Sequence, residues 1–171
     1  MSKEEIHACR GHVLVLPFPV QSHINPMLQF SKRFSSKGLK VTLVTTIFIT
    51  KSMQAARAGP IRIESFSDGY DEGGIKEALK TDEYVKRFKA IGPKNILELI
   101  EKQNRYGHPV NCLLYDSVIP WGLNLAKELG LIGAAFYTQS CSVNAIYYII
   151  HKGLISTCVI GVEFLATLLG I

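Results

Sequence analysis

Apolar residues along the chain form short continuous runs that alternate with segments of helical spacing. The runs at 12–18 (HVLVLPF) and 110–116 (VNCLLYD) lack the regular polar positions of a half-exposed strand. Such runs are typical of parallel strands covered on both faces of a sheet. Further strands are predicted at 39–46, which is rich in β-branched residues, at 61–66 and at 132–138.

Helices are predicted between these strands from proline and glycine positions and from the spacing of apolar residues. We expect Asn25 to cap a helix that starts at Pro26 and ends before Gly38. Shorter helices are expected at 48–59, 120–130 and 143–153. The longest helical region is expected to begin at Thr81 as its N-cap and to reach about Asn104, with a kink or break at Gly92-Pro93.

The glycine-rich acidic segment SDGYDEGG, residues 67–74, stands between the third strand and the longest helix. Its composition predicts a mobile surface loop. Loops in the range 68–80 are expected to help shape a ligand pocket.

Strands that alternate with helices predict an α/β fold with a parallel, doubly wound, Rossmann-like sheet and right-handed crossovers. The 171 residues, of which 47% are hydrophobic, suit one domain with a sizeable core. We expect this domain to cover residues 1–153. No internal repeat or low-complexity segment interrupts it.

Charge and cysteine usage exclude several classes of function. The net charge of +5 is spread along the chain, and its densest basic patch, VKRFKAIGPK, alternates with apolar residues. This pattern indicates a solvated helix face and argues against nucleic-acid binding. The four cysteines are widely separated without metal-ligand spacing, so neither a disulfide framework nor a metal site is expected. With no signal-peptide pattern at the start, the expected compartment is the cytoplasm.

Polar residues follow the predicted strands at their carboxyl ends, where ligands of open α/β sheets bind. Ser22 and His23 follow the first strand, Asp116 ends the fourth, and Thr138 and Gln139 end the fifth. If the strand order is 3-2-1-4-5, His23 and Asp116 face one crevice. An imidazole beside a carboxylate is the arrangement of a general base and its orienting partner. Three structural alternatives stay open: a hydrogen-bonding histidine without catalytic function, Asp116 as a cap of the following helix, and ordinary strand-end hydrogen bonding by Thr138 and Gln139.

The segments PFPVQSHINPMLQFSKRFSSKGLKVTLVTT and CLLYDSVIPWGLNLAKELGLIGAAFYTQSCSVNAIYY closely resemble plant family 1 UDP-dependent glycosyltransferases of small molecules. The resemblance covers roughly residues 8–153 and is closest to the subgroup that glucosylates carboxylic acids, phenols and thiohydroximates. It implies the N-terminal, acceptor-binding domain of a GT-B fold, in which a second domain binds the nucleotide sugar. The implied reaction transfers glucose from UDP-glucose with inversion, without cofactor or metal.

The resemblance assigns roles to single residues of this chain. It implies that His23 takes the acceptor proton and that Asp116 holds and polarises His23. Thr138 and Ser22 are implied contacts to the donor sugar. Phe18 and Gln21 are implied to line the acceptor pocket. The implied partners are a small-molecule acceptor and a UDP-sugar, and no glycine-rich phosphate loop is needed in this half.

The family pattern stops after YYIIHKG, and residues 154–171 (LISTCVIGVEFLATLLGI) form a divergent apolar tail without a donor-binding motif. We therefore keep a second hypothesis: a non-catalytic acceptor-binding fragment of a truncated or misspliced gene. The tail is expected to be a packed or aggregation-prone helix rather than a membrane span, because it is barely long enough and contains Glu163. Self-association through the tail or the exposed cleft face is expected. A nicotinamide-dependent dehydrogenase is disfavoured because the glycine fingerprint is missing.

Overall fold

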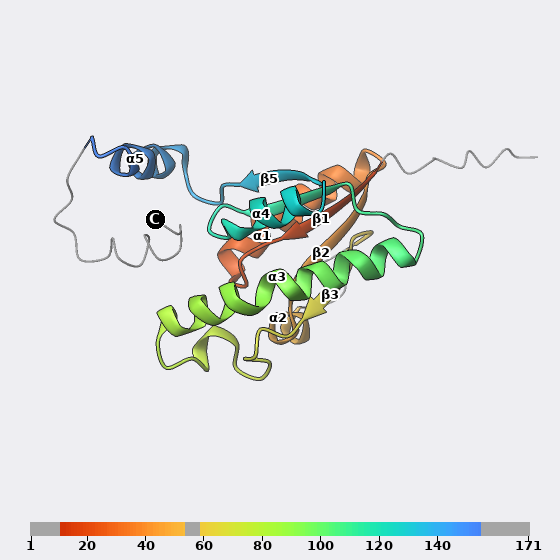
Figure 1. The fold of residues 1–171 in the computed structure, drawn as a ribbon, viewed down its shortest axis with the longest axis horizontal. Coiled ribbons are helices and arrows are strands. Elements are labelled where there is room, and N and C mark those ends of the chain that lie inside the picture. Colours follow the sequence, from red (N-terminus) through yellow and green to blue (C-terminus); the bar gives the residue numbers. More distant parts are fainter. Residues whose placement is uncertain (1–10, 54–58, 155–171) are drawn as a thin grey trace, which may run out of the picture.

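The computed structural model describes residues 11–53 and 59–154 of the chain. Five parallel strands form one sheet in the order β3-β2-β1-β4-β5 (Figure 1). The strands are β1 (His12–Leu16), β2 (Lys40–Thr46), β3 (Arg62–Phe66), β4 (Cys112–Asp116) and β5 (Ile132–Phe136). The predicted α/β class and strand order are confirmed, although β1 and β5 each end two residues earlier than expected.

Helices follow the strands in the alternation that the sequence predicts. They are α1 (Gln21–Ser36), α2 (Ile47–Ser52), the short 3-10 helix η2 (Gly74–Lys76), α3 (Thr81–Arg105), α4 (Trp121–Glu128) and α5 (Cys141–His151). The second half of the predicted 48–59 helix includes residues 54–58, which lie outside the described residues. Figure 1 shows α5 beyond the carboxyl end of β5, away from the sheet.

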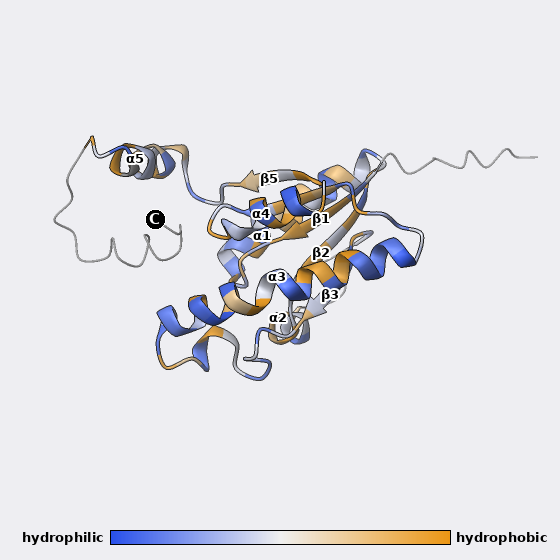
Figure 2. Cartoon of the chain, viewed as in Figure 1, coloured by the Kyte–Doolittle hydropathy of each residue, from blue (hydrophilic) through white to orange (hydrophobic). Residues whose placement is uncertain are grey.

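The central strand β1 is buried on both faces, as its continuous apolar run predicts. Leu14 and Leu16 pack into a core under α3 and α4, whereas Val13 and Val15 pack into a second core under α1. Burial of each such side chain contributes about 1.5–3 kcal/mol. In Figure 2, β1 is coloured hydrophobic, and α3 shows hydrophilic and hydrophobic colour in alternation along its length. This two-sided burial fixes the position of β1 and of the loop that follows it.

The strand register brings the carboxyl ends of β1, β4 and β5 level with one another. Leu16 of β1 pairs with Tyr115 of β4, and Asp116 pairs with Phe136 at the last position of β5. The segments that follow these three strands therefore start at one edge of the sheet.

Helix α1 begins earlier than the sequence predicts, because Gln21 and not Pro26 is its first residue. Val20 stands at the N-cap position and its carbonyl accepts the N–H groups of His23 and Ile24. Pro26 lies inside the helix, where it leaves the carbonyl four residues earlier, in the exposed first turn, open to water. The prediction of Asn25 as N-cap was wrong. His23 consequently lies on a helix and not in a loop.

Helix α3 runs from Thr81 through Gly92-Pro93 without a break, so the predicted split does not form. The proline leaves the carbonyl of exposed Lys89 without a helical partner, and water can satisfy it. Gly92 instead permits close packing, because a Cβ there would lie 2.7 Å from Cζ2 of Trp121. The expected N-cap Thr81 is the first helical residue, one position after the cap Lys80.

The segment 67–74 differs from the surface loop that its composition predicts. Asp68 is fully buried and Tyr70 is 8% exposed, while Gly69 and Glu72 lie at the surface. The prediction of a surface position was therefore wrong for Asp68 and Tyr70. The predicted mobility of the loop stays a prediction.

The expectation that the C-terminal tail forms a packed or aggregation-prone helix stays untested. Residues 155–171, nearly all of the predicted apolar tail, lie outside the described residues. Among the residues that are described, no helix is long and apolar enough to cross a membrane. Within the same residues, Cys112 and Cys141 are free thiols.

Candidate functional site

The imidazole of His23 meets the carboxylate of Asp116 at the carboxyl edge of the sheet. His23 lies in the first turn of α1, and Asp116 is the last residue of β4. Nδ1 of His23 is 2.7 Å from Oδ2 of Asp116. This distance is short for a nitrogen–oxygen hydrogen bond and typical of a charge-assisted one. The predicted contact between these two side chains is confirmed.

Asp116 is held from several sides inside the protein. Its side chain is 0% exposed, against 16% for His23. The backbone N–H of Val118 donates to Oδ1 at 3.2 Å, and that of Phe18 donates to Oδ2 at 3.4 Å. The bond from Val118 closes a turn two residues long and does not cap α4, whose N-cap position is Pro120, so the alternative of Asp116 as a cap of that helix was wrong. Low local dielectric strengthens both interactions.

The contact to Asp116 selects one tautomer of His23. A carboxylate oxygen accepts the Nδ1–H, which leaves the lone pair on Nε2. Within the described part of the chain, Nε2 has no hydrogen-bond partner, and the His23 side chain is partly exposed. Nε2 is therefore the nitrogen that can accept a proton from a bound molecule. If it does so, the buried carboxylate stabilises the imidazolium that forms.

Thr138, just after β5, joins the same group. Its Oγ1 lies 3.0 Å from Nδ1 of His23 and 3.4 Å from Oε1 of Gln139. The hydroxyl can donate to the Gln139 amide while its lone pair faces the Nδ1–H. Residues from three strand ends thus converge, as the register requires.

The other predicted site residues lie nearby in different environments. Phe18 is 7% exposed, and its ring stands edge-on to the His23 ring with 5.8 Å between centroids. Gln21 and Ser22 are exposed in the first turn of α1, where Nε2 of Gln21 donates to Oδ1 of Asn25 at 2.7 Å. The binding roles of Phe18, Gln21, Ser22 and Thr138 stay predictions.

Sequence reasoning missed a buried polar pair close to this site. The Tyr84 hydroxyl of α3 donates to Oδ2 of Asp68 at 2.5 Å, and both side chains are almost completely buried. Burial, and then the Asp68 carboxylate, raise the pKa of the Tyr84 phenol far above its usual range. The S-D-G-Y turn was the available signal, because Asp side chains commonly accept the N–H two residues later. Here Tyr70 donates that bond at 3.0 Å.

The described residues contain no group of three or more histidine, cysteine or acidic side chains that could hold a metal ion. The His23–Asp116 pair combines a partly exposed side chain that can accept a proton with a fully buried carboxylate.

Comparison with known proteins finds relatives in sequence. Residues 11–66 match the family described as glycosyltransferase, N-terminal domain. The chain is 46% identical over 140 residues to UDP-glycosyltransferase 74F2 of Arabidopsis thaliana, an alignment covering 82% of this chain and 31% of that protein. It is 43% identical over 142 residues to indole-3-acetate beta-glucosyltransferase of Zea mays, covering 83% and 30% of the two chains.

Solved structures share the fold. Os79 from O. sativa, in complex with U2F and trichothecene, superposes with a TM-score of 0.79 at 35% identity. That superposition covers 88% of this chain and 34% of Os79. A second Os79 structure, in complex with UDP, gives a TM-score of 0.78. In sequence and in fold, the described residues therefore correspond to the N-terminal GT-B domain of plant UDP-dependent glycosyltransferases, of which this chain spans about a third.

Proposed function

We propose that this domain provides the acceptor side and the catalytic base of an inverting glucosyl transfer from UDP-glucose to a small molecule. The acceptor is a hydroxyl or carboxyl compound, as in the subgroup of plant enzymes that the chain resembles. The observation that carries the proposal is the 2.7 Å contact of His23 with fully buried Asp116, which leaves Nε2 available. No metal is required, because the diphosphate of the donor is already a good leaving group.

The proposed step balances with these residues alone. Nε2 of His23 takes the proton of the acceptor O–H, and the acceptor oxygen forms a bond to C1 of glucose. The bond between C1 and the diphosphate oxygen breaks, and UDP leaves with the electron pair. Attack from the face opposite UDP inverts the configuration at C1. A single base suffices, unlike the paired carboxyl groups of a glycosidase.

Thr138 and Ser22 are proposed to contact the donor sugar, and Phe18 and Gln21 to border the acceptor. Thr138 is supported by its 3.0 Å approach to His23, which places its hydroxyl beside the proposed reacting atoms. Ser22 and Gln21 are supported by their exposure on the same helical turn as His23. Phe18 is supported by its ring contact with His23.

A second function is favoured by the extent of the match. The chain spans 31% of UDP-glycosyltransferase 74F2 and 34% of Os79. Binding of the UDP-sugar is proposed to depend on the remaining part of such an enzyme. Without that remaining part, the domain would bind acceptors but would not transfer glucose, because the positioning of both reactants supplies much of the rate of transfer.

The test measures transfer of radiolabelled glucose from UDP-glucose to a panel of phenols and carboxylic acids. The 171-residue chain is compared with a chimera that joins residues 1–153 to the C-terminal part of UDP-glycosyltransferase 74F2. His23→Ala is the test variant. His108→Ala is the matched control, because His108 is an exposed histidine that precedes β4, at the opposite edge of the sheet.

Transfer that His23→Ala abolishes and His108→Ala preserves would support the proposed base. If only the chimera is active, the 171-residue chain is an acceptor-binding domain. If His23→Ala leaves the chimera fully active, the proposed mechanism is wrong.

A further inference from the structure

A buried carboxylate in the acidic loop, which we define as residues 67–77, takes no part in the proposed reaction. Asp68 is 0% exposed. It accepts the Tyr84 hydroxyl at 2.5 Å through Oδ2 and the Tyr70 N–H at 3.0 Å through Oδ1. A buried charge is costly unless it is paired in this way. The hydrogen bond from Tyr84 therefore anchors the acidic loop against α3.

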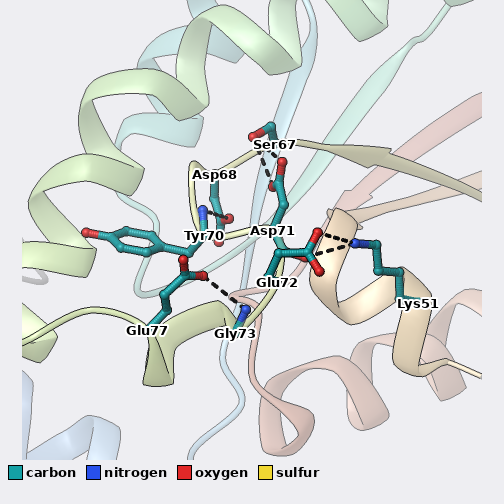
Figure 3. A network of polar contacts seen from close by, with 8 residues as sticks. All are labelled: Lys51, Ser67, Asp68, Tyr70, Asp71, Glu72, Gly73 and Glu77. Carbon is teal, nitrogen blue, oxygen red and sulfur yellow. Dashed lines mark hydrogen bonds and ion pairs between the residues drawn. The ribbon is translucent and has the colours of Figure 1, made fainter.

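Further contacts fix the acidic loop in place, as Figure 3 shows. Ser67 donates to the Asp71 carboxylate at 2.9 Å, and Lys51 of α2 pairs with Glu72 at 2.8 Å. On the α3 side, Nδ2 of Asn95 donates to the Ser67 carbonyl at 3.0 Å. Arg87 lies over the Tyr70 ring and donates to the carbonyl of Asp68 at 3.3 Å. The loop is thus tied to both flanking helices.

An unbroken series of ring contacts leads from this pair to the imidazole. The Tyr84 ring meets the Phe18 ring edge-on, at 6.2 Å between centroids, and Phe88 supports Phe18 at 5.7 Å. Phe18 in turn stands edge-on to His23 at 5.8 Å. The backbone N–H of Phe18 also points at the Asp116 carboxylate. Phe18 therefore contacts Tyr84 on one side and both members of the His23–Asp116 dyad on the other.

We propose that Asp68 and Tyr84 form a positioning pair, which holds Phe18 and through it fixes the orientation of the His23 ring. This inference rests on the proposed function for its relevance to catalysis. Neither residue touches the reacting atoms. The pair also couples the acidic loop to the dyad, so a change in that loop reaches the base.

The physical basis is the cost of leaving Asp68 unpaired. If the Tyr84 hydroxyl is removed, a fully buried carboxylate loses its strongest donor, and the loop must move to let water reach it. The Tyr84 ring then loses the tether that keeps it against Phe18. If Asp68 becomes an uncharged amide in the same variant, no buried charge is left without its donor, so the drive that moves the loop is much smaller.

The experiment is nitrogen-15 NMR of the His23 side chain in the 171-residue chain, which reports the tautomer and the ring mobility. Tyr84→Phe keeps the ring and removes the hydroxyl. We expect it to broaden or shift the His23 signals and to lower the share of the Nδ1–H tautomer. The double variant Tyr84→Phe/Asp68→Asn is expected to restore them largely.

Thr42→Val is the matched control for a merely structural effect. It also removes one buried hydroxyl contact, 2.8 Å from Nε2 of His12, but on a different histidine and away from the dyad. We expect Thr42→Val to leave the His23 signals unchanged. In an active chimera, Tyr84→Phe should lower kcat roughly three- to tenfold, with the KM for UDP-glucose unchanged.

Unchanged His23 signals in Tyr84→Phe, or equal changes in Thr42→Val, would overturn the proposal. If Tyr84→Phe fails to fold, Arg87→Gln replaces it. Arg87 is exposed, and its loss removes the hydrogen bond to the Asp68 carbonyl and so loosens the loop. The His23 signals must then change in the same way, by a smaller amount. The NMR result stands whether or not the domain takes part in transfer. Failure of the proposed function and failure of this inference are therefore distinguishable.

Discussion

The substitution Asp116→Asn offers a direct test of the dyad. The two side chains have nearly the same shape, so the buried site can accept the change without a cavity. The amide group, however, carries no charge and can donate as well as accept. Two backbone N–H groups, from Val118 and Phe18, already occupy the carboxylate oxygens. The amide oxygen is expected to keep one of them and the amide NH2 to face His23.

The size of the effect follows from the geometry. An amide N–H that faces Nδ1 of His23 forces the proton onto Nε2, so the base loses its lone pair. The charge stabilisation of an imidazolium is lost as well. With Nδ1 and Oδ2 2.7 Å apart, the centres of the two charges lie about 4 Å apart, which is worth about 4 kcal/mol at an effective dielectric constant of 20. This corresponds to roughly a 10³-fold loss in the rate of transfer.

Two measurements check this prediction. Nitrogen-15 NMR of the 171-residue chain should show His23 change from the Nδ1–H to the Nε2–H tautomer in Asp116→Asn. In Asp116→Asn the glucosyl-transfer chimera should lose activity about 10³-fold, with a loss of about 1–3 kcal/mol in stability because one buried N–H loses its acceptor, whereas His108→Ala should retain the activity. A variant that keeps both the Nδ1–H tautomer and its full rate would show that Asp116 neither orients nor stabilises the imidazole.

Three further predictions concern the site and the sheet below it. Thr138→Val, which removes the hydroxyl 3.0 Å from His23, should lower transfer in the chimera about fivefold; an unchanged kcat would contradict this role. Gly122→Ala should reduce the free energy of unfolding, measured in urea, by about 1–2 kcal/mol. The new Cβ would lie 2.6 Å from Cγ of Tyr115, and this strain exceeds the gain in helix propensity of about 1 kcal/mol. A stabilised variant would refute this reasoning. Burial, followed by nearby positive charges, lowers the pKa of His12 in the folded protein, so its contribution to stability is complete above about pH 6.5 and is lost as the pH falls. The urea midpoint should therefore drop between pH 7 and pH 5 in the wild type, and less in His12→Gln; equal drops would contradict the assignment.

The architecture could be predicted because burial on both faces leaves a strong trace in the sequence. The run HVLVL has no polar position that could face water after His12, and even that histidine is buried and bonded on both ring nitrogens. Helix boundaries were less predictable. Proline is favoured at the first position of a helix, which predicts a start at Pro26, but α1 begins five residues earlier, at Gln21. Packing of Ile24 and Met27 against the sheet outweighs the lost hydrogen bond.

The dyad was predictable and its surroundings were not. His23 and Asp116 each stand at the end of a strand, so topology alone brings them together. The Asp68–Tyr84 pair joins a loop to a helix through a contact between residues 16 positions apart. Composition marked that loop as acidic and glycine-rich, which describes its exposed residues but not its buried carboxylate. Only the packing of α3 over the sheet makes Asp68 an interior residue.

The early start of α1 has a consequence for the chemistry. Placed on the first helical turn, His23 has a backbone held by the Val20 carbonyl and by the packed neighbours Ile24 and Met27. A base must stay within hydrogen-bond reach of its substrate, and a rigid element holds it there more accurately than a loop does. Phosphate-binding members of this fold class put glycines at the same turn so that a ligand can approach the backbone. This chain has no glycine fingerprint at that turn and places there the imidazole of His23, which is the proposed base.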